Sequence, residues 1–260
     1  MRALKSWLTA PVLWFAFVAA LMATWAAMDP AALIRAFDQD GRSPFELATL
    51  PFFAAIVPLV WWRCPFSGSR RRRTVLCLAV SVVALMAIVK ELDLHNMALH
   101  VLYPSIVGDD GSILPGVLTR PDGRPLVGTP FKARFLTNAA VPLGAKAVVV
   151  AYFASFFGVF AATLAYFALP FVKGVFALHP VAWSVGCFGA SGVLVQIADR
   201  LPSWLGHAHG LQKSAEGVTA AQSLCTALEE GGEMMIALFA LLAICQSWLL
   251  LRDASARPRP

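Results

Sequence analysis

Long apolar runs separated by short polar segments organise this chain. A helix needs about 17 to 25 mostly apolar residues to cross a hydrocarbon core about 30 Å thick. Six runs of this kind are present, at 8–28, 45–62, 74–89, 141–169, 181–198 and 234–251. Strands of a membrane β-barrel would instead give alternating segments of about ten residues. The pattern therefore predicts an all-α, polytopic membrane helix bundle of about six spans.

Composition supports this interpretation. Hydrophobic residues make up 58% of the 260 residues and charged residues only 14%, with a mean hydropathy of +0.69. A soluble domain carries about 25% charged residues. The chain is basic, with a pI near 9.3, but its Lys and Arg side chains gather at the ends of the apolar runs and form no aromatic-interleaved patch. We therefore expect membrane lipid, and not nucleic acid, as its partner.

The distribution of positive charge predicts the orientation. Short cytoplasmic loops retain Lys and Arg during insertion, and the run Arg70–Arg73 is the densest basic segment of the chain. Placing it inside puts both termini in the cytoplasm and leaves Asp253 as the only inner residue among 15 acids. This gives a single transmembrane domain, 1–260, with an outer loop insert at 91–139 and an outer loop at 199–232 that leads into the last helix.

Two local features have competing interpretations. The first apolar run follows Arg2 and Lys5 and could be a signal peptide, but it is longer than a usual signal core, so we expect a retained span. The five cysteines form no CxxC pair and no closely spaced framework, so we expect them to act as small apolar side chains.

In the fifth run, Gly186, Gly189 and Gly192 have a spacing that lets helices approach closely.

Ionisable residues collect at three outer ends of the runs. Lys90 to His95 follow the third run, Asp199 and Arg200 end the fifth, and Glu229, Glu230 and Glu233 lead into the sixth. Because these ends share one leaflet, we expect them to meet. Glu91 and His95 are four residues apart, as are Glu229 and Glu233, so each pair would share a helix face if its helix is continuous.

Carboxylates and an imidazole in this pattern suit a divalent metal ion, with acids favouring the harder cations. The predicted ligands are Glu91, His95, Asp199, Glu229 and Glu233. Glu230 is then a candidate general base, and Lys146 and Arg200 are candidate anchors for a lipid phosphate. A purely structural ion network is the alternative, because charge costs least at helix ends and Glu in a first turn stabilises the helix dipole.

Two short motifs resemble a known kind of protein. Lys90-Glu91-Leu92-Asp93-Leu94-His95 and Glu229-Glu230-Gly231-Gly232-Glu233-Met234 are similar to the basic-E-x-D-x-H and E-E-x-x-E-M segments of a bacterial multispan membrane protein family without known activity. The resemblance implies a bacterial inner-membrane setting. Ceramidase-like membrane hydrolases are a more distant comparison, since they use a histidine-held zinc and this chain lacks their H-x-x-x-H pair.

These observations favour an integral membrane protein with a periplasm-facing carboxylate and histidine site that binds a divalent metal. If it is an enzyme, we expect a metal-dependent hydrolase or transferase that acts on a membrane lipid. The alternatives are an accessory or scaffold subunit bound to other membrane proteins, or a proton- or cation-coupled transporter. Ionisable groups are scarce at the middle of the runs, which weighs against transport by a single chain.

Overall fold

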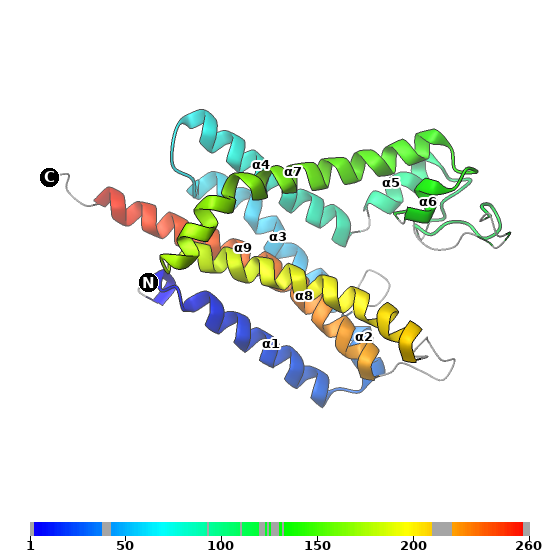
Figure 1. The fold of residues 1–260 in the computed structure, drawn as a ribbon, viewed down its shortest axis with the longest axis horizontal. Coiled ribbons are helices and arrows are strands. Elements are labelled where there is room, and N and C mark those ends of the chain that lie inside the picture. Colours follow the sequence, from blue (N-terminus) through cyan, green and yellow to red (C-terminus); the bar gives the residue numbers. More distant parts are fainter. Residues whose placement is uncertain are drawn as a thin grey trace. The chain divides into compact units, whose positions relative to one another are not determined.

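The computed structural model of this chain is built from helices (Figure 1). It describes residues 3–37, 43–92, 94–109, 111–119, 123, 125, 130–131, 133–209 and 220–256. Within these ranges there is no strand, only two isolated β-bridges. The elements are η1 (Ala3–Lys5), α1 (Thr9–Ala27), α2 (Pro30–Phe37), α3 (Pro44–Arg63), α4 (Arg70–Glu91), α5 (Leu94–Leu102), α6 (Ala133–Thr137), α7 (Leu143–Phe176), α8 (Pro180–His209) and α9 (Ala220–Ala256). The prediction of an all-α fold is confirmed.

Five helices, α1, α4, α7, α8 and α9, are long and apolar enough to cross a membrane. The chain is thus a multi-pass membrane protein. In α3 the apolar part is the shorter stretch Leu47–Arg63, which contains Pro51 and Pro58. A sixth span through α3 stays a prediction.

Several helices run past the ends of their apolar runs. At 1.5 Å per residue, the 37 residues of α9 extend over about 55 Å, well beyond a core of about 30 Å. Most of the predicted outer loop at 199–232 is helical, because α8 continues to His209 and α9 begins at Ala220; its position outside the membrane stays a prediction. Apolar runs mark only the lipid-facing part of a helix, while Ala, Leu, Glu and Gln continue it into polar surroundings.

By its internal contacts the chain forms two compact units where one domain was predicted. Unit 1 comprises Met1–Ala84 and Tyr166–Pro260, and unit 2 comprises Leu85–Ala165. The boundaries fall inside α4 and α7, so each of these two helices contributes residues to both units.

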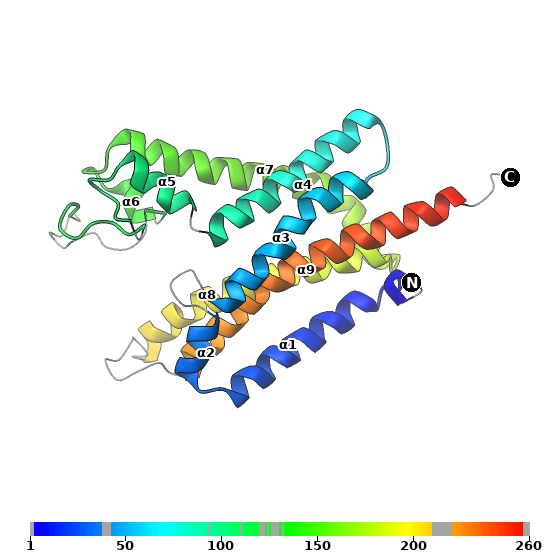
Figure 2. The same ribbon diagram turned by 180° about the vertical axis from the view of Figure 1, so that it is seen from behind.

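Helix α9 is the centre of unit 1. It packs against α1, α2, α3 and α8, and Figures 1 and 2 show α8 and α9 side by side. Polar bonds join these helices where their apolar surfaces meet. Ser184 Oγ of α8 donates to Gln246 Oε1 of α9 at 2.7 Å, and both side chains are fully buried. Trp14 Nε1 of α1 donates to Ser191 Oγ of α8 at 3.2 Å. Such bonds stabilise helix pairs in lipid, where apolar contact alone discriminates little.

One end of unit 1 gathers four segments that the charge pattern placed on the cytoplasmic side. Lys5 forms an ion pair with Asp253, near the last turn of α9. Trp7 packs on Trp183 of α8, with ring centroids 5.1 Å apart. Ser247 Oγ of α9 donates to Pro65 O, directly after α3, at 2.5 Å. Lys5 and Asp253, close to the two ends of the chain, therefore lie at the same end of unit 1, as the predicted topology requires.

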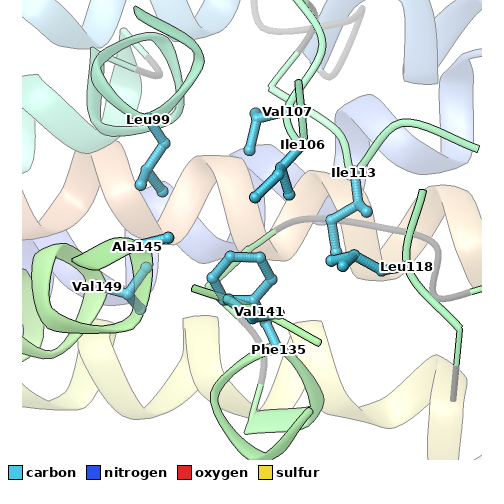
Figure 3. Packing of buried hydrophobic residues seen from close by; sticks show 9 residues of the cluster. All are labelled: Leu99, Ile106, Val107, Ile113, Leu118, Phe135, Val141, Ala145 and Val149. Atoms are coloured by element: carbon cyan, nitrogen blue, oxygen red, sulfur yellow. The ribbon is translucent and has the colours of Figure 1, made fainter. Parts of the chain in front are cut away.

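Unit 2 contains a hydrophobic core in the segment that was predicted as an outer loop insert. Figure 3 shows Phe135 of α6 pointing into this core and Leu99 of α5 facing α7. The core residues are Leu99, Ile106, Val107, Ile113, Leu118, Phe135, Val141, Ala145 and Val149, all buried. We call this part of unit 2 the cap.

Side-chain bonds hold the connections of the cap. His100 Nδ1 lies 2.8 Å from Val107 O; because a carbonyl only accepts, the Nδ1 nitrogen carries the proton. Asn138 Nδ2 donates to Thr119 O at 2.8 Å. His100 lies in intact α5 and serves the cap.

Removal of the Phe135 ring should unfold the cap. The side chain is fully buried, so Phe135→Ala is expected to cost about 3–5 kcal/mol of local stability. Hydrogen exchange of backbone amides between Leu99 and Leu118 should accelerate strongly, whereas α9 should keep its protection. Val117→Ala is the control, since that side chain is 46% exposed. Equal protection in both variants would mean that the cap has no cooperative core.

The orientation is testable with single cysteines in a background without the native five. Arg71 and Val117 are both exposed. In intact cells a membrane-impermeant maleimide should label Val117→Cys but not Arg71→Cys, because the Arg run is expected inside. Both should react once the membrane is permeabilised. The reverse pattern would invert the topology.

Candidate functional site

The three glutamates of the last predicted span form an acidic turn on α9. Glu229, Glu230 and Glu233 lie inside this helix, beginning about 14 Å from its first residue. They are therefore not cap residues of a first turn, which was the structural alternative for their position. Since α9 is continuous here, the predicted shared face of Glu229 and Glu233 is confirmed.

The acidic turn is close-packed and partly buried. One carboxylate oxygen of Glu230 and one of Glu233 lie within 4.8 Å of each other. Glu233 is only 8% exposed, and Glu229 and Glu230 are half-buried. Two carboxylates at this separation repel each other when both are ionised, so a cation, a proton or a donor must compensate them. This is the arrangement that a hard divalent cation uses, with oxygen ligands at about 2.0–2.6 Å from the ion.

A glycine pair within this turn lets two helices approach α9. A Cβ atom on Gly231 would lie 2.3 Å from Leu21 Cδ1 of α1, and one on Gly232 would lie 2.5 Å from Val195 Cγ2 of α8. The acids are thus placed where α1 and α8 approach α9 closely. The sequence-based expectation of close approach at Gly189 and Gly192 is not met within the described part of the chain, where no atom lies within 4 Å of a Cβ at either position.

Asp199 and Arg200, also in unit 1, form an ion pair. Arg200 Nε lies 3.2 Å from Asp199 Oδ2, and both side chains are about half exposed or more. This neighbour pair neutralises itself on α8. Asp199 as a metal ligand, and Arg200 as a phosphate anchor, stay predictions.

The remaining predicted site residues lie in unit 2. Glu91 is the last residue of α4, and its Oε1 lies 3.5 Å from Lys90 Nζ. Lys146 lies in the first turn of α7 and is half-buried. Glu91 and His95 do not share a helix face, because the continuous helix that this required is absent: α4 ends at Glu91 and α5 begins at Leu94. His95 belongs to α5, and its side chain falls outside what the structure describes.

Sequence reasoning missed the role of Gly231 and Gly232, and it missed the buried polar bonds between α8 and α9. A signal existed for the bonds, since Ser184 and Gln246 interrupt apolar runs. No spacing rule identified the glycine pair, because two adjacent glycines point to two different neighbours.

No protein-family model, curated protein or solved structure matches this chain. Its function must therefore be inferred from its own residues.

A methyl group at Gly232 should destabilise the bundle. Alanine normally stabilises a helix by about 1 kcal/mol relative to glycine, but here it would collide with the stiff side chain of Val195. We expect Gly232→Ala to lower the thermal midpoint of the detergent-purified protein, and Val195→Ala in the same chain to restore most of the loss. Gly189→Ala, in open space, should be neutral or stabilising. Additive effects of Gly232→Ala and Val195→Ala would show that the two positions do not interact.

Proposed function

We propose that this integral membrane protein binds a divalent metal ion through the acidic turn of α9. The observation that carries the proposal is the pair Glu230 and Glu233, whose carboxylate oxygens lie within 4.8 Å of each other while Glu233 is 8% exposed. Burying a carboxylate is costly in a membrane protein, so such groups mark functional positions by default. Glu229, one turn before Glu233, is close enough in the helix to serve the same ion.

The proposed ligand set extends to Glu91 and His95. This extension rests on the topology derived from positive charge, which assigns the end of the third run and the start of the sixth to one leaflet. An imidazole among the ligands would shift the preference from calcium and magnesium toward zinc, iron or manganese. The resemblance of the two motifs favours the bacterial inner membrane, with this site facing the periplasm.

We propose lipid as the substrate if the protein is an enzyme. A metal ion supplies a Lewis acid and lowers the pKa of a bound water. Glu230 is half-buried next to Glu233 and would act as the base beside an ion held by Glu229 and Glu233, while Lys146 and Arg200 would hold a lipid phosphate. The accessory-subunit alternative needs none of this chemistry.

Metal content is the test. Purified protein dialysed against a mixture of divalent cations should retain about one equivalent, and Glu233→Gln, which preserves shape, should lose it. Saturation at a hundredfold excess over Kd should stabilise the wild type by about 2.7 kcal/mol. Asp253→Asn is the matched control, since it removes a carboxylate from the other end of α9.

Two further variants test the finer parts of the proposal. Glu91→Gln should weaken metal affinity if that residue is a ligand, and leave it unchanged if the site belongs to α9 alone. Metal-loaded protein should release a headgroup or acyl chain from mixed-lipid vesicles, and Glu230→Gln should not. Metal-free wild type, with the same stability as Glu233→Gln, would instead support an accessory subunit.

A further inference from the structure

Two cysteines in unit 1 have their sulfur atoms in contact. Cys64 follows the last residue of α3, and Cys77 lies two turns into α4. Their Sγ atoms are 3.9 Å apart. Sequence spacing does not predict this pairing, because the two residues are thirteen positions apart and form no CxxC motif.

Contacts on both sides hold this pair in place. Arg63, directly before Cys64, stacks its guanidinium on Trp62 at 3.7 Å and on Trp248 of α9 at 4.4 Å from the ring centroids. Pro65, directly after Cys64, accepts the hydrogen bond from Ser247. The Cys77 thiol also contacts Val60 O at 3.5 Å. Contacts with α3, α4 and α9 therefore hold both sulfur atoms in place.

The two thiols differ in access. Cys64 is half-buried, whereas Cys77 is 3% exposed. A reagent from water can therefore reach Cys64 first, and Cys77 is placed to attack the mixed disulfide that forms on Cys64. Accessible and resolving cysteines are arranged in this way in thiol switches.

The surrounding charge favours one class of reagent. Arg70, Arg71, Arg72 and Arg73 open α4 next to the pair, and all four side chains are exposed. This basic run disfavours a soft metal cation and attracts an anion. A small anionic disulfide fits the charge and the chemistry of the site together.

We propose that Cys64 and Cys77 are a redox modification site that closes to an intramolecular disulfide by exchange with a low-molecular-weight anionic disulfide, such as oxidised glutathione. The Cys64 thiolate attacks one sulfur of the reagent, forming a mixed disulfide and releasing one thiolate. The Cys77 thiolate then attacks the Cys64 sulfur and releases the second thiolate. The reagent gains two electrons, the two cysteines lose them, and the two thiol protons pass to the released thiolates.

The bond would tie the end of α3 to α4. On the predicted cytoplasmic side the pair is reduced under ordinary conditions and closes when the glutathione pool is oxidised. The sulfur atoms must approach to about 2.05 Å, which requires rotation of the two side chains from their present contact.

The test is peptide mapping by mass spectrometry of full-length protein in lipid nanodiscs, equilibrated with glutathione buffers from fully reduced to fully oxidised. Wild type should lose both thiols together, with a mass loss of two hydrogen atoms in a 64–77 cross-linked peptide. Cys77→Ser should stop at a glutathione adduct on Cys64, and Cys64→Ser should leave Cys77 unmodified.

The charge is tested separately by the rate. Arg70→Gln with Arg71→Gln should slow the reaction with oxidised glutathione by up to about tenfold, and leave the reaction with neutral hydroxyethyl disulfide unchanged. Persistent glutathione adducts on wild type, links between two chains, or two thiols that stay free in oxidised buffer would each overturn the proposal.

Discussion

The packing of α1 and α8 against α9 at Gly231 and Gly232 is the constraint on which unit 1 depends. In lipid, helices gain little from apolar contact as such, so they associate where small residues allow close approach and where polar groups pair across the interface. Both occur on α9, with the glycine pair near the acids and Gln246 bonded to Ser184 farther along the helix. The carboxylates of Glu230 and Glu233 are therefore carried by a helix that packs against α1, α2, α3 and α8.

The position of the acids inside α9 indicates a chemical role that their order in the sequence does not indicate. Glutamates in the first turn of a helix stabilise its dipole and need no other explanation. Glutamates several turns inside a helix, on a face packed against neighbours, carry a desolvation cost instead. The cost must be offset by a cation, a proton or hydrogen bonds, and a divalent ion offsets two carboxylates at once. The desolvation cost of glutamates inside a helix, which first-turn glutamates do not carry, is the reason that we propose a metal ion.

Unit 2 follows a different principle, because its cap has an ordinary hydrophobic core. Phe135, Leu99 and most of their neighbours come from segments with no long apolar run, and they pack on Val141, Ala145 and Val149 at the start of the run 141–169. A chain with long lipid-facing helices thus also carries a folded element that the search for spans classifies as loop. On the predicted cytoplasmic side, Arg70–Arg73 favour the inward orientation of their loop. The same run and Arg63 lie next to Cys64 and Cys77.

The sequence by itself determined the fold class, five of the spans and the shared end of Lys5 and Asp253, because run length and charge asymmetry act locally and survive without tertiary contacts. Only the tertiary structure decided that α8 and α9 extend into the predicted outer loop as far as His209 and Ala220, that α4 and α5 are separate helices at Glu91 and Leu94, and that Cys64 meets Cys77. Helix ends and side-chain contacts depend on partners distant in the chain. The apolar pattern of the sequence does not predict these helix ends and contacts.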